Sequence, residues 1–76
     1  MLVYVVLSNY DESSRVVYAG NDYERANISA IAAARTLRQT GGDAKLEVWD
    51  NGELKDEKWF ELVGGKMSVE RRMPNE

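Results

Sequence analysis

The chain contains neither cysteine nor histidine among its 76 residues. Disulfides are therefore excluded, and the most common transition-metal ligands and neutral-pH proton carriers are missing. A chain of this length forms one domain at most, and its fold has to come from burying hydrophobic side chains. Hydrophobic residues make up 43% of the sequence, but seven of them are alanines. We therefore expect a marginally stable monomer or a homodimer rather than a very stable monomer.

The first twenty residues have the pattern of two antiparallel strands. Residues 2–7 are apolar at every position and rich in β-branched side chains, which is typical of a strand that is covered on both faces or central in its sheet. Residues 9–14 are polar and predict a connecting turn of five or six residues. Residues 15–19 predict the second strand, with a register that this turn leaves open.

The following segment predicts one alanine-rich helix. Asp22 is a suitable N-cap, and the pair Gly41 and Gly42 is a suitable C-terminal cap. Between them, apolar residues recur at steps of three and four, as expected for the buried side of a helix. Small side chains on that side allow the helix axis to lie close to a sheet. The expected buried residues are Tyr23, Ala26, Ala30, Ala33, Ala34 and Leu37, with Ile31 beside them.

The second half predicts a tight hairpin. Residues 45–50 alternate between apolar and polar side chains, and the Asn51–Gly52 pair that follows suits a type I′ turn, where both residues need positive φ. Across such a turn Trp49 faces Leu54 and Asp50 faces Glu53. Trp49 and Leu54 then share the face of the hairpin that is opposite to Leu46 and Val48.

After Lys58 two interpretations remain. Residues 59–63 form either a short helix that starts at Asp56 or a strand that pairs with residues 66–70 across Gly64 and Gly65, and the strand is favoured. We expect one α+β domain over residues 1–70 and a flexible tail over 71–76. The expected order is strand, strand, helix, strand, strand, with the C-terminal strand or short helix added, and the small antiparallel sheet packs against the helix.

The residues show no pattern of a catalytic, metal or cofactor site. Asp50 and Glu53 flank a turn, where water keeps both carboxylates ionised, whereas a catalytic pair needs an environment that separates their pKa values. The run Asp50, Asn51, Gly52 lacks the spaced acids of a calcium loop. Neither glycine pair precedes a helix with the lysine of a phosphate-binding loop. We therefore expect a protein that is not an enzyme and holds no cofactor or metal.

Charge and tryptophan content favour protein binding. The net charge is −3, and residues 43–61 carry seven acidic side chains against three lysines. Tryptophan surrounded by polar residues is enriched at binding hot spots. We expect Trp49 and Leu54 to form the contact surface unless Trp59, Phe60 or a second subunit covers it. The polar residues expected around that surface are Glu47, Asp50, Glu53 and Asp56.

The alternative function is nucleic-acid binding. Exposed tyrosines can stack on bases, and arginines can contact phosphates. The tyrosines considered are Tyr4, Tyr10 and Tyr18. The acidic segment 43–61 would repel phosphates, and the spacing matches no common RNA-binding signature. The arginines that would make the contacts are Arg25, Arg35 and Arg38 on the helix and Arg71 and Arg72 in the tail.

The layout of residues 1–57 resembles small accessory proteins of phages and prophages. The features that carry the resemblance are the Val-Tyr-Val-Val opening, the alanine-rich helix and the Glu-Val-Trp-Asp-Asn-Gly-Glu hairpin. The resemblance implies a protein that binds a host enzyme, polymerase or defence complex and inhibits or redirects it.

The longest apolar run is too short to span a membrane and lacks the flanks of a signal peptide. We thus expect no membrane association and a cytoplasmic location, which is the host cytoplasm for a phage protein.

Overall fold

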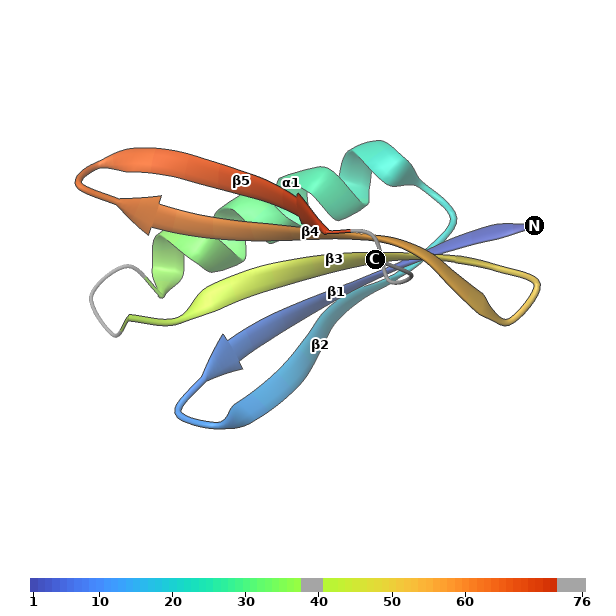
Figure 1. Ribbon diagram of the computed structural model, residues 1–76, viewed down its shortest axis with the longest axis horizontal. Coiled ribbons are helices and arrows are strands. Elements are labelled where there is room, and N and C mark those ends of the chain that lie inside the picture. Colours follow the sequence, from blue (N-terminus) through green and yellow to red (C-terminus); the bar gives the residue numbers. More distant parts are fainter. Residues whose placement is uncertain (38–40, 73–76) are drawn as a thin grey trace.

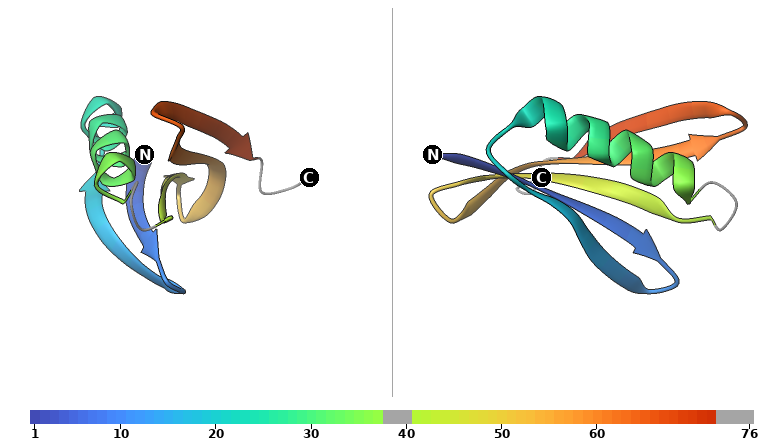
Figure 2. Two further views of the ribbon diagram at one scale, coloured as in Figure 1. Left: turned by 90° about the vertical axis from the view of Figure 1, so that its left-hand side faces the viewer. Right: turned by 180° about the vertical axis from the view of Figure 1, so that it is seen from behind.

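The fold is a five-stranded antiparallel sheet with one helix against one of its faces, so the α+β class expected from the sequence is confirmed (Figures 1 and 2). The structure is a computed structural model and describes residues 1–37 and 41–72. The strand order in the sheet is β2-β1-β3-β4-β5. The elements are β1 Leu2–Tyr10, β2 Ser13–Gly20, α1 Tyr23–Thr36, β3 Asp43–Asp50, β4 Glu53–Val63 and β5 Lys66–Arg72.

The two hairpins on either side of α1 both turn through two residues with positive φ. Asn51 and Gly52 have φ values of 52° and 83°, and the hairpin pairs Trp49 with Leu54 as expected. The first hairpin is tighter than expected, because β1 continues to Tyr10 and only Asp11 and Glu12, with φ values of 50° and 65°, form its turn. Aspartate suits such a turn, but glutamate stands at the second position, where glycine is usual, so the sequence gives no clear signal for it.

The C-terminal part of the sheet settles the interpretation of residues 59–63. β4 is one continuous strand of 11 residues, and it pairs with β5 across Gly64 and Gly65. The strand alternative is therefore the observed one, and a helix at this place is excluded. Arg71 and Arg72 belong to β5 rather than to a tail, where they pair with Lys58 and Glu57. Residues 73–76, the rest of the expected tail, lie outside the described residues.

α1 begins as expected and ends earlier. The Asp22 side chain accepts a hydrogen bond from the backbone N–H of Arg25 at 3.1 Å, which makes Asp22 the N-cap. The helix ends at Thr36 with Leu37 as its C-cap, so the expected glycine cap is wrong. Gly42 has a different role, because a Cβ there would lie 2.4 Å from the backbone oxygen of Asn9. The glycine allows the start of β3 to approach β1.

The core lies between α1 and the middle of the sheet. The three buried residues of α1 are all alanines, namely Ala26, Ala30 and Ala34. They face fully buried side chains of β1, β3 and β4, of which the largest are Phe60, Leu46 and Val6. Around this centre lie partly buried residues that include Tyr4, Tyr18, Ile31, Ala33, Val48 and Met67.

The expected place of Tyr23 in the buried stripe is wrong, because its side chain is 41% exposed. It instead packs edge to face on Tyr4, with 5.4 Å between ring centroids.

Enlarging the alanine stripe is expected to separate the two layers. Ala30→Leu adds three carbons where α1 meets the sheet, so it should lower the free energy of unfolding by about 1–3 kcal/mol. Ala32→Leu is the matched control, since Ala32 is exposed on the same helix and should tolerate leucine. Urea denaturation measures both. Equal stability of the two variants would contradict the close packing of α1.

Removing the left-handed strain in the first hairpin is expected to stabilise the domain. A non-glycine residue in that conformation costs roughly 1–2 kcal/mol, whereas glycine loses roughly 0.5–1 kcal/mol more backbone entropy on folding. Glu12→Gly should therefore raise the free energy of unfolding by about 0.5 kcal/mol.

Gly52→Ala is the converse variant in the second hairpin and should lower the free energy of unfolding. Its Cβ would meet no heavy atom within 4 Å, so only backbone strain changes. The same denaturation curves report both changes, and a destabilised Glu12→Gly would contradict the turn geometry.

Candidate functional site

The face of the sheet opposite α1 is the candidate site, and we call it the open face. Side chains alternate between the two faces of a strand. Since Val6, Leu46 and Phe60 are buried beneath α1, the residues beside them in sequence point away from the helix. No helix or strand of the described chain covers that face, as the view along the sheet shows (Figure 2).

The structure brings Trp49 and Leu54 together on the open face, as the sequence predicts, and adds Val3 to the same row. Trp49 Nε1 donates a hydrogen bond to Glu47 Oε1 at 3.1 Å. The other oxygen of Glu47 lies 3.1 Å from Lys45 Nζ, and both charged side chains are largely shielded from solvent. Glu47 therefore lies beside Trp49 as expected, and it fixes the orientation of the indole.

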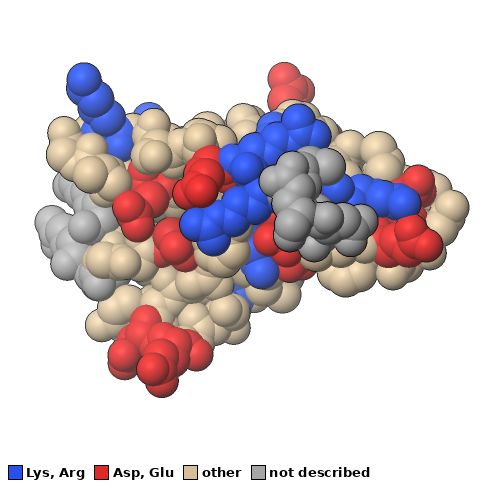
Figure 3. All heavy atoms as spheres, in the orientation of Figure 1, with Lys and Arg blue, Asp and Glu red and all other residues tan. Residues whose placement is uncertain are grey.

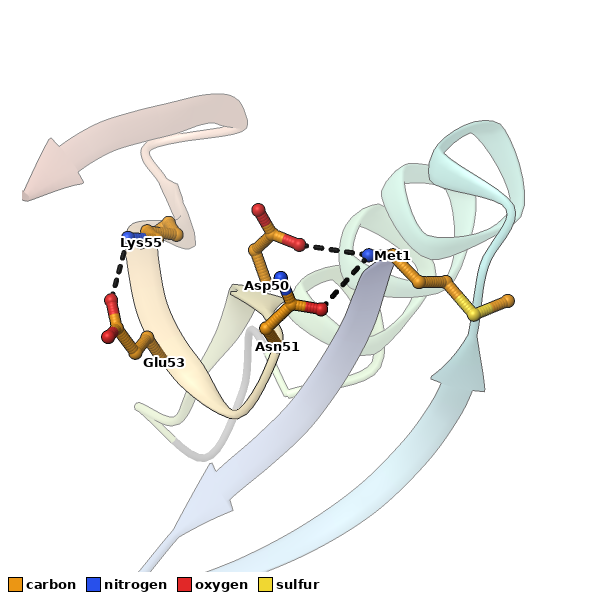
Figure 4. A network of polar contacts seen from close by, with 5 residues as sticks. All are labelled: Met1, Asp50, Asn51, Glu53 and Lys55. Carbon is orange, nitrogen blue, oxygen red and sulfur yellow. Dashed lines mark hydrogen bonds and ion pairs between the residues drawn. The ribbon is translucent and has the colours of Figure 1, made fainter.

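Asp50 and Glu53 form the last residue pair of the β3–β4 hairpin, at its turn (Figure 4). Because side chains alternate along a strand, they point to the face opposite to Trp49 and Leu54 rather than around them. Asp50 Oδ1 accepts a hydrogen bond from the amino group of Met1 at 3.0 Å, and Asn51 lies 3.4 Å from the same nitrogen. Glu53 and Lys55 form an ion pair at 2.8 Å. The hydrogen bond from Lys55, followed by its charge, lowers the pKa of Glu53. Lys55 thus stabilises the ionised form of Glu53.

Asp56 does not belong to the expected acidic ring. The pairing of β3 with β4 shifts between Val48 and Trp49, so that Asp56 lies opposite Val48 on the face that carries the helix. There its carboxylate receives a hydrogen bond from Arg71 Nε at 2.8 Å. A regular hairpin would have placed Asp56 opposite Glu47, and this bulge is the reason for the difference.

Trp59 is the open-face residue that the sequence analysis did not assign to a site. Lys45 Nζ and the guanidinium carbon of Arg72 each lie 5.0 Å from the centroid of its ring. Its Nε1 is buried and has no hydrogen-bond partner. The sequence signal that could have placed Trp59 on the open face is strand alternation. In a continuous strand, a buried Phe60 requires Trp59 to point to the opposite face.

Two open hollows meet at Trp59 and Asp43. The larger, of about 410 Å³, lies between the β1–β2 turn and the Gly41–Gly42 segment. The smaller, of about 140 Å³, is bounded by Glu61, Glu70 and Arg72. Carboxylates thus outnumber cations around Trp59. No group of three histidine, cysteine or acidic residues in the described part of the chain could hold a metal ion.

The arginines of the nucleic-acid alternative do not form one surface. Arg25 and Arg35 are on α1, Arg71 is on the helix side of the sheet with Asp56, and Arg72 is on the open face with Glu70. Arg25 is itself 3.7 Å from Asp22. Arg38 lies outside the described residues. Tyr4 and Tyr18 pack against the core, and of the three tyrosines only Tyr10 is half exposed.

Comparison with protein-family models, curated proteins and solved structures finds no match to this chain. In the described residues, no helix has the length and apolar character needed to cross a membrane.

The two tryptophans are expected to respond differently to phenylalanine. Trp49→Phe loses the hydrogen bond to Glu47, whereas Trp59→Phe removes a donor that has no partner. Trp49→Phe should therefore cost about 1 kcal/mol more in the free energy of unfolding. Each variant loses a similar ring area, so each is the control for the other in urea denaturation. A larger loss for Trp59→Phe would contradict the two indole environments.

Proposed function

We propose that this chain is a protein-binding module without enzymatic activity, and that it binds its partner through the open face around Trp49 and Leu54. The observation that carries the proposal is the row of Val3, Trp49 and Leu54 on a sheet face that no described element covers. An antiparallel sheet commonly has one face against the core and one face in water, and the face in water is normally polar. An uncovered apolar row that contains tryptophan and has polar neighbours is typical of a binding surface.

The state of the ionisable groups supports a binding role over catalysis. No polar or charged residue in the described part of the chain is fully buried. Ion pairs hold Glu47, Glu53 and Asp56 with Lys45, Lys55 and Arg71. For Glu53, the hydrogen bond from Lys55 and the lysine charge lower the pKa, which makes this carboxylate poorly suited to exchange protons near neutral pH.

The charge of the β3–β4 hairpin supports a basic partner, since residues 43–61 contain seven acids and three lysines. With the resemblance to phage and prophage accessory proteins, we extend the proposal to a modulator or inhibitor of a host protein in the host cytoplasm. A homodimer through the same face would bury the same row, so the oligomeric state is measured together with binding.

The double variant Trp49→Ala, Leu54→Ala tests this proposal in pull-downs from a bacterial lysate analysed by mass spectrometry. The wild type should capture a defined partner that the double variant loses, because truncating the row removes its apolar contact. Ile28→Ala is the control, since Ile28 is 63% exposed on α1 and lies in the other layer. Identical partner lists for the wild type and the double variant would contradict the proposed surface.

A further inference from the structure

We infer that the open face binds one amphipathic basic helix of a partner protein, lying along the strands above the boundary between β1 and β3. The inference rests on the proposed function and adds the chemistry and orientation of the bound element. It is carried by a division of the open face into an apolar half and an acidic half.

The apolar half lies on β1 and β2 and extends onto the row of Trp49 and Leu54. Val16 is 55% exposed and Val3 is 37% exposed, so this surface is accessible to a partner. The pairing of β1 with β2 places Leu7 opposite Val16 and Val5 opposite Ala19. Among the open-face residues Val3, Val5, Leu7, Val16 and Ala19 of β1 and β2, none is charged.

The acidic half lies on β3, β4 and β5. Its cations are Lys45 and Arg72, which pair with Glu47 and Glu70. The remaining carboxylates of this half take part in no ion pair within the described residues. A partner can therefore neutralise them without breaking an existing pair. These carboxylates are Asp43, Glu57 and Glu61. Figure 3 shows acidic and basic side chains side by side over this part of the sheet.

Apart from Trp49 and Leu54 at the hairpin end of β3 and β4, the boundary between the two halves runs between β1 and β3, along the direction of the strands. A boundary in this direction favours a helix as the bound element. Neighbouring strands are about 4.8 Å apart, and a helix with its side chains is about 10 Å wide. One helix above β1 and β3 thus lays one flank on the apolar half and the other flank on the acidic half. α1 already covers the opposite face in this way, with contacts to β1, β2, β3 and β4.

The environment of Trp59 shows that the acidic half accommodates cationic side chains. Lys45 and Arg72 both lie against its ring, beside the hollow that Glu61 and Glu70 line. A basic flank of the partner helix would meet the same combination of indole and carboxylates, which favours guanidinium and ammonium groups.

Charge also argues against a second copy of this chain as the occupant. In a two-fold symmetric contact across the whole face, carboxylates of one acidic half would lie near those of the other copy or on its apolar half. Like charges and unpaired charges at an interface both oppose association. A partner with basic residues avoids both penalties.

Selection from a phage-displayed library of randomised helical peptides against the immobilised protein tests the inference. The enriched peptides should carry an apolar stripe at helical spacing with lysine or arginine along one flank. Their affinity should fall as salt rises, because exposed charge pairs are screened. Val16→Asp and Glu57→Lys should each weaken binding at least about tenfold, equivalent to about 1.4 kcal/mol.

Two matched controls separate these effects from general changes in charge and hydrophobicity. Ile28→Asp and Glu24→Lys make the same kinds of change at exposed positions of α1, and both should leave affinity unchanged. Failure to enrich peptides, enrichment of peptides without basic residues, or equal binding by the open-face variants would overturn the inference. So would a dimer in sedimentation velocity that Val16→Asp abolishes, since that assigns the face to a second copy.

The result can be separated from a failure of the proposed function. A captured protein that depends on Trp49 and Leu54, but is insensitive to salt and to Glu57→Lys, would retain the proposed function and overturn only the basic helix. A partner whose binding is changed neither by the Trp49→Ala, Leu54→Ala double variant nor by Glu57→Lys would overturn both the proposed function and the inference.

Discussion

The close contact between the alanine stripe of α1 and the sheet determines how the rest of the molecule is arranged. Alanine at every buried helix position brings the layers together but contributes little apolar surface, so Val6, Leu46 and Phe60 supply the large buried side chains. One helix above five strands also leaves the other side of the sheet without a layer of its own. The small core and the open face therefore have the same cause.

The sequence of β1 indicates that the open face is apolar where this strand contributes to it. A strand whose odd and even positions are both apolar is typical of a sheet that is packed against other elements on both faces. In the structure Val6 packs against the helix, and the side chains on the open face are Val3, Val5 and Leu7. β3 and β4 differ, because most of their open-face positions carry charged residues and each strand has one tryptophan on that face. The pattern predicted a strand that is covered on both faces or central in its sheet. In the structure β1 lies between β2 and β3, and the helix covers one of its two faces.

Periodicity and turn chemistry predicted most of the fold, and local backbone irregularities limited the prediction of the site. The helix, its Asp22 cap and the Asn51–Gly52 hairpin have strong local signals, so they were predictable. The turn at Asp11 and Glu12 has glutamate at a position of positive φ where glycine is usual, and its length was therefore overestimated. Trp49 and Leu54 lie close to a turn whose register is predictable, so their pairing was predicted. Asp56 lies beyond a bulge that no residue pattern indicates, so its face was not predictable.

That bulge decides which aromatic residue enters the core. In an uninterrupted hairpin from Asp50 and Glu53, Ala44 would lie opposite Trp59, and the indole would have to fit beneath α1. The extra residue in β4 moves Phe60 opposite Ala44 and places Trp59 opposite Lys45. Phe60 has no polar atom to satisfy, so it suits the buried position, and Trp59 gains two cations at its ring. A shift of one residue exchanges the faces of a strand, and here it produces both the compact core and the aromatic centre of the acidic half.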